Sequence, residues 1–471
     1  MTEQPRTRQD LYDRIRQSSK EEFILDEMIR LGFWSASGEI PNDPADEIRR
    51  RGEIQRELDT LRAENRRLHN EEALKKAALK LRMAESRCKQ QETKARRERE
   101  RQERAVAWQA RQASEINYLG EGVSAGLNQT NSDLERLQQH QLPILHTAAD
   151  LAIAMNISIG QLRFLAFSRR VATISHYIHF QIPKKTGGVR EISAPLPRLK
   201  QAQQWILDNI LERVVLHPTA HGFRRGRSII TNAQPHVGAL AVINLDLQNF
   251  FPSISYCRIK GIFRSLGYSE AIATILGLVC TEPNVTTVEL DGKSYYIAQE
   301  QRYLPQGAPS SPALTNLLCR RLDRRLDRMA QNRGFTYTRY ADDLTFSTID
   351  RDKLKDIGNI LQGTQNIVTH EGLTIHPDKT RVLRNSQQQE VTGVVVNQKL
   401  NIDRSTLRRF RATLYQIEKD GLAGKQWGQS TDLLQSIVGF ANYVAMVNPS
   451  KGSEFLAQVQ RIQKKYGKRK R

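Results

Sequence analysis

The pattern of hydrophobic and polar positions divides the chain into a helical first part and a mixed second part. Between positions 45 and 114 the chain has almost no glycine or proline and is rich in Glu, Arg, Lys, Gln and Leu. Within this stretch Ile54, Leu61 and Leu68 repeat every seven residues, with Leu58 between them. This repeat predicts a long helix that contains a short coiled-coil stretch.

The segments on either side of this helix have different patterns. Residues 1–44 predict a small helical segment, and three glycines between positions 120 and 126 mark a linker. Farther on, Tyr177–Ile192 alternates in the manner of two strands joined by a Gly-Gly turn, and strands and helices are mixed thereafter. We therefore expect five parts: 1–44, a helical segment; 45–116, a long helix or coiled coil; 117–136, a linker; 137–395, a body of strands and helices; and 396–471, a C-terminal part with a basic tail.

The positive charge lies in the second part. The net charge is +21, and residues 1–135 hold 26 basic and 26 acidic residues, so the whole excess belongs to the remainder. Lys and Arg that neutralise phosphates give salt-sensitive affinity for nucleic acid. The alternative, that the charge only aids solubility, explains less well why it is concentrated in one part.

Cysteines and hydropathy restrict the class of protein. No run of 18 or more apolar residues is present, and the polar beginning of the sequence does not resemble a secretion signal. The cysteines have no CxxC spacing, so we expect neither a zinc site nor a disulfide framework, but a cytoplasmic protein without membrane contact. The four cysteines are Cys88, Cys257, Cys280 and Cys319.

Three carboxylates are the strongest candidates for chemistry. Asp342 and Asp343 are adjacent, and their apolar and β-branched flanks predict two short strands around a tight turn. Asp246 ends an apolar strand well before this pair. Like charges side by side are costly to bury unless a divalent cation holds them. Two Mg²⁺ ions are the usual partners, because they bind carboxylate oxygens and can clamp both reacting oxygens of a phosphoryl transfer.

These motifs resemble those of reverse transcriptases, and more narrowly those of bacterial retron reverse transcriptases. The resemblance covers roughly residues 138–471. It implies an α+β fold with the fingers, palm and thumb of a right-hand polymerase, preceded by an all-α coiled-coil extension. The motifs that carry it are Asp246 with Phe250 and Phe251, the Gln306-Gly307 turn, Tyr340–Asp343, the Asn-Ala-x-x-His pattern in Thr231–His236, and Val391-Thr392-Gly393.

The resemblance implies roles for the residues of a nucleotide site. Asp246, Asp342 and Asp343 would hold two Mg²⁺ ions, with the carbonyl of Leu247 as a further ligand. Phe251 would exclude a ribose 2′-hydroxyl, so the substrate would be a dNTP. Gln306 could instead be only a turn residue, and the alternation of the segment directs Phe250 toward the core. The predicted nucleotide-binding residues are Lys184, Lys185, Arg190, Asn249, Phe250, Phe251, Gln306 and Gly307.

Further residues are candidates for contact with nucleic acid. Basic side chains beside small residues can contact a phosphate backbone. By the resemblance, Asn232 and His236 would either recognise RNA or brace the active site. A lone histidine is more often structural. Residues 391–393 either approach the primer terminus or form a buried strand with a glycine bulge. The full set is Arg224, Arg225, Arg227, Asn232, His236, Val391, Thr392, Gly393, Arg408 and Arg409.

The resemblance implies an RNA-directed DNA polymerase that binds its own structured noncoding RNA, starts from a 2′-hydroxyl of that RNA and makes branched msDNA in antiphage defence. One alternative is another bacterial reverse transcriptase, of the group II intron, diversity-generating or abortive-infection type. A second alternative is a non-catalytic RNA-binding scaffold, against which the three aspartates argue. For the charged helix we favour binding of a protein partner or self-association, and RNA contact or a plain spacer remain open.

Overall fold

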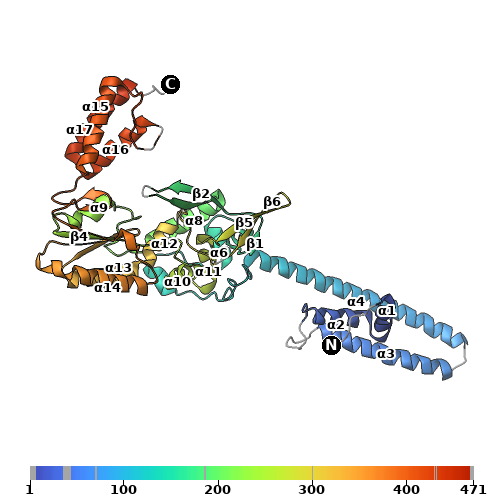
Figure 1. Ribbon diagram of the computed structural model, residues 1–471. Coiled ribbons are helices and arrows are strands. Elements are labelled where there is room, and N and C mark those ends of the chain that lie inside the picture. Colours follow the sequence, from blue (N-terminus) through green and yellow to red (C-terminus); the bar gives the residue numbers. More distant parts are fainter. Residues whose placement is uncertain are drawn as a thin grey trace. The chain divides into compact units, whose positions relative to one another are not determined.

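The protein folds into two compact units, Met1–Val106 and Ala107–Arg471, which Figure 1 shows as a ribbon. This computed structural model describes residues 7–34, 44–68, 72–184, 187–299, 301–428, 430 and 432–466. The described part of the first unit is helical, and the second unit combines helices with strands. The predicted α+β class with an all-α extension is therefore confirmed. Among the described helices, none is long and apolar enough to cross a membrane.

The helices of the first unit are α1 (Arg8–Gln17), α2 (Lys20–Arg30), α3 (Pro44–Leu68) and most of α4 (Glu72–Ser114). Ser19 caps α2, since its hydroxyl accepts from the amide of Glu22 at 3.0 Å and the Glu22 carboxylate accepts from the amide of Ser19 at 2.8 Å. Glu22 also pairs with Arg56 of α3 at 3.2 Å. A Cβ on Gly52 would lie 2.0 Å from the Glu22 Oε1, so a larger residue there would displace the Glu22 carboxylate.

The predicted heptad positions are largely exposed within this chain. Two helices, α3 and α4, occupy the stretch for which one long helix is predicted. Ile54, Leu58 and Leu61 of α3 are 51%, 39% and 64% exposed, and Leu81 of α4 is 65% exposed. Their apolar surface is therefore available to a partner, and the coiled coil stays a prediction.

The larger core of the second unit is built by helices. Every residue of α11 from Ala271 to Cys280 is buried, so this helix runs through the interior. The segment predicted as a linker contributes to the same core through Leu119 and Leu127, and Ile116, the residue before that segment, is part of this core too. The helices around this core are α5 (Leu134–Gln139), α6 (Ala148–Ala154), α7 (Ile159–Ala166), α8 (Pro197–Asn209), α10 (Tyr256–Ser265), α11 (Glu270–Cys280) and α12 (Ser311–Leu318).

A four-stranded antiparallel sheet, in the order β7-β8-β4-β9, carries the predicted carboxylates. Apolar side chains such as Ile243 and Phe346 pack against Leu326 and Ile360 of the neighbouring helices. Figure 1 shows two helices, α13 and α14, lying along one side of the sheet. The elements are β4 (Ala241–Asp246), β7 (Thr336–Tyr340), β8 (Asp343–Thr348), β9 (Arg381–Arg384), α13 (Arg320–Asn332) and α14 (Ile357–His370).

A buried ion pair fixes β7 on α13. The guanidinium of Arg339 donates to both carboxylate oxygens of Asp323, each at 2.7 Å, and neither side chain is more than 1% exposed. The Tyr337 hydroxyl donates to the same carboxylate at 3.0 Å. Burial disfavours the charged guanidinium, but the attraction of Asp323 outweighs it and raises the pKa of Arg339. Arg339 therefore stays charged inside the protein, held by its partner.

Smaller sheets surround this palm sheet. The fingers hairpin pairs β2 (Tyr177–Pro183) with β3 (Val189–Pro195) in antiparallel register. A second sheet has the order β1-β6-β5, and β10 and β11 form a short hairpin. The remaining elements are β1 (Val171–Ala172), β5 (Val285–Leu290), β6 (Lys293–Ala298), β10 (Glu390–Val391), β11 (Val394–Val395), α9 (Ile229–Ala233), η1 (Leu211–Arg213), η2 (Gln234–His236), η3 (Asp352–Asp356) and η4 (Pro377–Lys379).

The C-terminal part is a three-helix bundle, as expected of a thumb. It contains α15 (Arg404–Asp420), α16 (Leu433–Val447) and α17 (Pro449–Tyr466). Phe410 lies at its centre, with its ring centroid 4.8 Å from that of Trp427, 4.6 Å from Phe440 and 5.2 Å from Phe455. These aromatic contacts hold the three helices together.

Replacing Arg339 with Met should lower the free energy of unfolding by about 3–5 kcal/mol, because Asp323 would be left buried without its partner. The double variant Arg339→Met, Asp323→Leu should recover much of this loss, since it removes both charges. Urea denaturation would measure both, with Arg351→Met, an exposed position in the second unit, as the control. If Arg339→Met alone were as stable as the parent protein, the role given to this ion pair would be contradicted.

Candidate active site

The strand register brings the three predicted carboxylates to one end of the palm sheet. Asp246, the last residue of β4, lies directly opposite Asp343, the first residue of β8. Asp342 precedes it in the turn between β7 and β8, and its carbonyl accepts from the amide of Leu247 at 3.0 Å. The structure therefore gathers residues that are far apart in the sequence.

These carboxylates form a site with excess negative charge. Burial, followed by repulsion from Asp342 and Asp246, raises the pKa of Asp343 to about 7. Burial also raises the pKa of Asp342, and Asp246 adds to the effect. The Lys379 ammonium lies 2.9 Å from the Asp246 Oδ1 and opposes both shifts. One lysine thus compensates only part of the charge of three carboxylates.

The site suits a divalent cation by its chemistry. Carboxylate oxygens are the ligands that Mg²⁺ prefers, and two of the carboxylates have raised pKa values, which a cation would reverse. Among the described residues, no three His, Cys, Asp or Glu side chains are already grouped as a metal site. A cation that binds Asp246 would have to compete with the Lys379 ammonium.

The turn that holds Asp342 has a strained backbone supported from two sides. Ala341 has a φ of 57°, in the left-handed region. Its carbonyl accepts from the Arg339 Nη1 at 3.1 Å. From the other side, a Cβ on Gly222 would lie 2.4 Å from the Ala341 amide nitrogen, so this position requires glycine. Asn316 links the two supports, because it donates to the Gly222 carbonyl at 2.9 Å and accepts from Arg339 at 3.0 Å.

His236 and Asn232 brace the hairpin of β7 and β8, which carries Asp342 and Asp343, from inside. The His236 ring joins the Ser347 hydroxyl at 2.6 Å to the Thr338 hydroxyl at 2.8 Å, one on each strand of the hairpin. Burial lowers the pKa of His236 to about 3, so one ring nitrogen donates and the other accepts. Asn232 donates to the Thr392 hydroxyl at 3.4 Å. Both side chains are fully buried, which supports bracing rather than direct RNA contact.

A cavity of about 920 Å³ opens beside the carboxylates and is lined by most of the predicted nucleotide-binding residues. Arg190 of β3 lies close enough to Asp342 to offset a small part of the rise in its pKa. Lys185 is outside the described residues. The predicted residues along the cavity are Lys184, Arg190, Asp246, Leu247, Asn249, Phe250, Phe251, Gln306 and Asp342.

Phe251 lies half-buried on the wall of this cavity. Its ring centroid is 5.7 Å from that of Phe250 and 6.4 Å from that of Phe223. Phe250 lines the cavity but is only 4% exposed, in agreement with its predicted place in the core. Aromatic contacts on two sides therefore limit how far the Phe251 ring can move.

The Gln306-Gly307 turn fixes the base of the fingers hairpin. The Gln306 carbonyl accepts from the amide of Ser193 on β3 at 2.8 Å, and its side chain lines the cavity. Gly307 has a φ of 132°, and a Cβ there would lie 2.8 Å from the Ser193 carbonyl oxygen. Gly307 thus acts by close packing, which positions Arg190 three residues earlier on the same strand.

The three arginines of the loop before α9 do not line the active-site cavity. Arg224 donates to the His217 carbonyl at 3.1 Å, and Arg225 pairs with Glu212 at 2.8 Å. Both line a separate hollow of about 570 Å³. Arg227 lines another hollow, beside β7. Their contact with nucleic acid stays a prediction for surfaces away from the carboxylates.

The hairpin of β10 and β11 presents Thr392 and Gly393 in a two-residue turn. Val391 pairs with Val394, and the φ angles of 47° and 82° at the two turn residues fit a type I′ turn. The Gly393 carbonyl accepts from the Tyr443 hydroxyl of α16 at 2.9 Å, which ties the thumb to this turn. Val391 itself is fully buried and supports the turn from within.

The predicted thumb residues lie on α15. Arg408 and Arg409 are both exposed. The Arg409 guanidinium lies 5.2 Å from the centroid of the Trp427 ring, so part of its side chain is used for packing.

Sequence reasoning missed several residues of the site. Lys379 of η4 and His376, the residue before η4, line the cavity, and the His376 amide donates to the Asp246 carbonyl at 2.7 Å. No motif marked them, because their role depends on the fold. Phe223 has a φ of 54° and also lines the cavity. The signal for it in the sequence is its place in His221–Ser228, directly before Arg224 and Arg225.

Comparisons with known proteins agree with these observations. The family described as reverse transcriptase (RNA-dependent DNA polymerase) matches residues 182–396. The retron Mx162 reverse transcriptase of Myxococcus xanthus is 40% identical over 376 residues, 76% of each chain. The retron Mx65 reverse transcriptase of Myxococcus xanthus is 40% identical over 67% of this chain and 72% of its own. The retron Ec86 reverse transcriptase of Escherichia coli is 33% identical over 71% of this chain and 94% of its own.

The charge of the site predicts a pH-dependent stability. The pKa of Asp343 is raised from 3.8 to about 7. The stabilisation of the folded state by the protonated Asp343 carboxyl is therefore fully present below about pH 4 and is lost as the pH rises to about 7. Without a divalent cation, the free energy of unfolding should fall over this range, and less so in Asp343→Asn. Excess Mg²⁺ should stabilise the protein more at pH 8 than at pH 5. Urea denaturation with EDTA or MgCl₂ would test this, and equal Mg²⁺ effects at both pH values would count against it.

Proposed function

The chain belongs to the bacterial retron reverse transcriptases and is an RNA-directed DNA polymerase; we propose that it copies part of a structured noncoding RNA into DNA by two-metal nucleotidyl transfer. The observation that carries the mechanism is the register of β4 and β8, which sets Asp246 opposite Asp343 beside Asp342. The excess negative charge of these side chains supports a site for two Mg²⁺ ions.

Asp246, Asp342 and Asp343 would hold the ions, with the Leu247 carbonyl as a further ligand. When bound, the two ions would activate a primer hydroxyl and neutralise the charge of the leaving pyrophosphate. The chain's own contribution is positioning, because Arg339 and Gly222 fix the turn of Asp342 before any substrate arrives. Lys379 would pair with Asp246 in the absence of metal.

The nucleotide would bind in the cavity between the fingers hairpin and the carboxylates. Lys184 and Arg190 are exposed on the hairpin side of this cavity, where their charges can bind a triphosphate. Gln306 faces the same space. Phe251 would exclude the 2′-hydroxyl of a ribonucleotide, so we assign dNTPs as the substrates.

The RNA would serve as both template and primer, with synthesis starting at one of its 2′-hydroxyls and giving branched msDNA. The retron names of the relatives support this proposal. The Thr392-Gly393 turn and the exposed Arg408 of the thumb are candidate contacts for the primer and the duplex. By family membership, we further propose a role in antiphage defence in the bacterial cytoplasm.

The exposed apolar positions of α3 and α4 support an assembly role for the first unit. Ile54, Leu61 and Leu81 are each more than half exposed, and coiled-coil partners bury such positions. We propose that this unit binds a protein partner or a second copy of the chain.

Primer extension on an RNA template with dNTPs and Mg²⁺ tests the catalytic proposal. Asp342→Asn should reduce extension by about a hundredfold or more, because it removes a charge that the cations need. Asp291→Asn, in the exposed turn between β5 and β6, is the matched control and should keep full activity. Equal activity in Asp342→Asn and the parent would refute the metal-binding role.

Sequencing of copurified nucleic acid would test priming, and the lack of a 2′-linked RNA–DNA junction would refute the branched product.

The sugar selectivity depends on the Phe251 ring. Phe251→Ala should raise the incorporation of ribonucleotides relative to deoxyribonucleotides by about tenfold or more, since it opens space beside the sugar. Phe251→Leu retains part of the bulk and should have a smaller effect. Single-nucleotide incorporation of each NTP and dNTP would give the ratio of kcat/KM values. An unchanged ratio in Phe251→Ala would remove this residue from the selectivity mechanism.

A further inference from the structure

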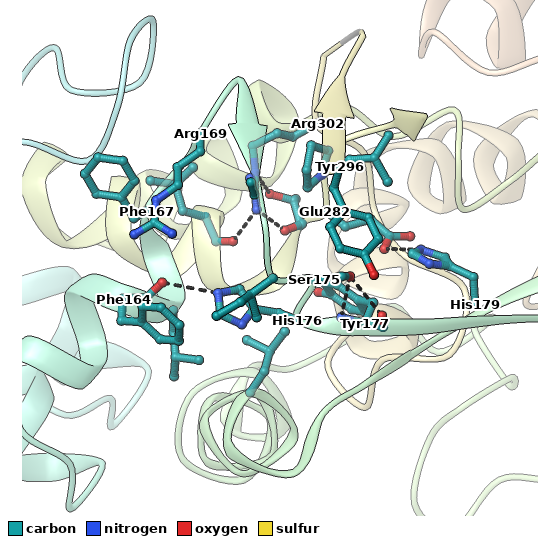
Figure 2. A pocket seen from close by; sticks show the side chains of 18 residues that line it. Phe164, Phe167, Arg169, Ser175, His176, Tyr177, His179, Glu282, Tyr296 and Arg302 are labelled. Atoms are coloured by element: carbon teal, nitrogen blue, oxygen red, sulfur yellow. Dashed lines mark hydrogen bonds and ion pairs between the residues drawn. The ribbon is translucent and has the colours of Figure 1, made fainter. Parts of the chain in front are cut away.

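Two hollows on the second unit share three residues, Phe164, Phe167 and Arg169, and have no lining residue in common with the active-site cavity. The inner one has a volume of about 70 Å³, which is room for only a few water molecules. The outer one has about 480 Å³, within the range of ligand-binding sites. Figure 2 shows Phe164, Phe167 and Arg169 together at one end of the inner cavity, away from His179. Only the outer hollow can therefore accept a molecule of nucleotide size.

The outer hollow is unusually rich in accessible aromatic rings. Trp108 lies near the end of α4, in the part of that helix that belongs to the second unit. Trp108 is 61% exposed, Tyr118 is 55% exposed and Phe164 is 38% exposed. The half-buried Phe167 joins them, with its ring centroid 5.9 Å from that of Tyr118 in an edge-on arrangement. Leaving such rings in water is unfavourable, and clustered exposed aromatics mark binding surfaces.

Arginines lie among these rings. The Arg169 guanidinium is 5.9 Å from the centroid of the Phe164 ring and 5.1 Å from that of Phe167. Arg163 lines the same hollow, and within the described part of the chain neither arginine forms an ion pair. The one carboxylate in the lining is Glu115, which accepts from the Asn117 amide at 3.4 Å. The hollow thus carries a net positive charge and suits an anionic partner.

We propose that this surface, formed by Tyr118, Phe164 and Phe167 with Arg163 and Arg169, binds unpaired nucleotides of single-stranded RNA. The rings would stack on the bases, and the guanidinium groups would contact the phosphates. Stacking requires bases that are not enclosed in a duplex, because an A-form helix hides their faces. The proposal rests on the proposed function for its RNA partner and goes beyond it by assigning a binding surface outside the active-site cavity.

The binding test uses the full-length protein and fluorescently labelled 12-nucleotide oligo(A) and oligo(U), with an RNA duplex of equal length for comparison. Tyr118→Ala should weaken binding to the single strands about tenfold, with little change for the duplex. Tyr118→Phe keeps the ring and should bind as the parent does. Tyr12→Ala, 59% exposed in the first unit, is the control for loss of a surface tyrosine. Arg169→Gln should weaken binding. It should also reduce the slope of log Kd against the logarithm of the salt concentration by about one.

Several outcomes would overturn the proposal. These are unchanged single-strand affinity in Tyr118→Ala, an equal loss for the duplex, or no rescue by Tyr118→Phe. A protein interface would be indicated instead if Tyr118→Ala changed self-association in sedimentation experiments without changing RNA affinity. Photocrosslinking of the unmodified protein to 5-bromouridine RNA gives a readout independent of variant folding. Crosslinks at Tyr118, Phe164 or Phe167 would support the surface, and crosslinks confined to other sites would refute it.

Failure of this proposal can be separated from failure of the catalytic one. Tyr118→Ala should extend a short, fully paired template–primer at the parental rate, because the hollow shares no lining residue with the active-site cavity. Asp342→Asn should in turn bind oligo(A) and oligo(U) with parental affinity. Loss of both properties in Tyr118→Ala would show a general defect and overturn the assignment of a separate surface.

Discussion

The buried ion pair between Arg339 and Asp323 is the constraint on which the carboxylate-bearing end of the palm sheet depends. An unpaired charge in this interior would be very costly, so the two side chains must be placed together, and a one-residue slip of β7 would direct Arg339 to the opposite face of the sheet. The pair therefore fixes the register of β7 against α13. The Arg339 side chain also donates to the Ala341 carbonyl, so the side chain that pairs with Asp323 also fixes the residue before Asp342.

The arrangement around Asp342 combines strain with repulsion. Three non-glycine residues with positive φ, Phe223, Asn249 and Ala341, line the cavity or adjoin Asp342. Each such residue costs about 1–3 kcal/mol and persists only where neighbours enforce it. The like-charged carboxylates add a further cost, which appears as the raised pKa values. Rigid support from buried groups is what allows carboxylates to be held this close together in the absence of any ligand.

The sequence predicted the parts of the site that short motifs encode. Asp246, Asp342 and Asp343 could be found because each lies at the end of an apolar strand or in the turn between two strands, and antiparallel pairing of those strands brings them together. The family pattern left His236 open between RNA recognition and bracing, but neither its partners nor the role of Arg339 could be found in this way, because a polar residue in an alternating strand or loop suggests a solvent-facing position. Their partners are distant in sequence, so only the fold reveals that they are buried. Lys379 was missed for the same reason, since its contact with Asp246 depends on how η4 is placed.

The Asn-Ala-x-x-His pattern in Thr231–His236 and the Val391-Thr392-Gly393 motif meet in one hydrogen-bonded network. This network explains why Thr392 occupies a turn position that is unfavourable for threonine. A type I′ turn favours Asn-Gly, and a β-branched residue at its first position is strained. Thr392 occupies that position, and its hydroxyl accepts from the buried Asn232. Asparagine in its place would relieve the backbone but would put an amide where the hydroxyl now meets Asn232. Because the Asn232 carbonyl in turn accepts from Thr338 of β7 at 3.4 Å, the turn and the catalytic hairpin are held by the same buried residue. The strain at Thr392 is therefore the cost of linking the turn tied to the thumb with the strands that carry the carboxylates.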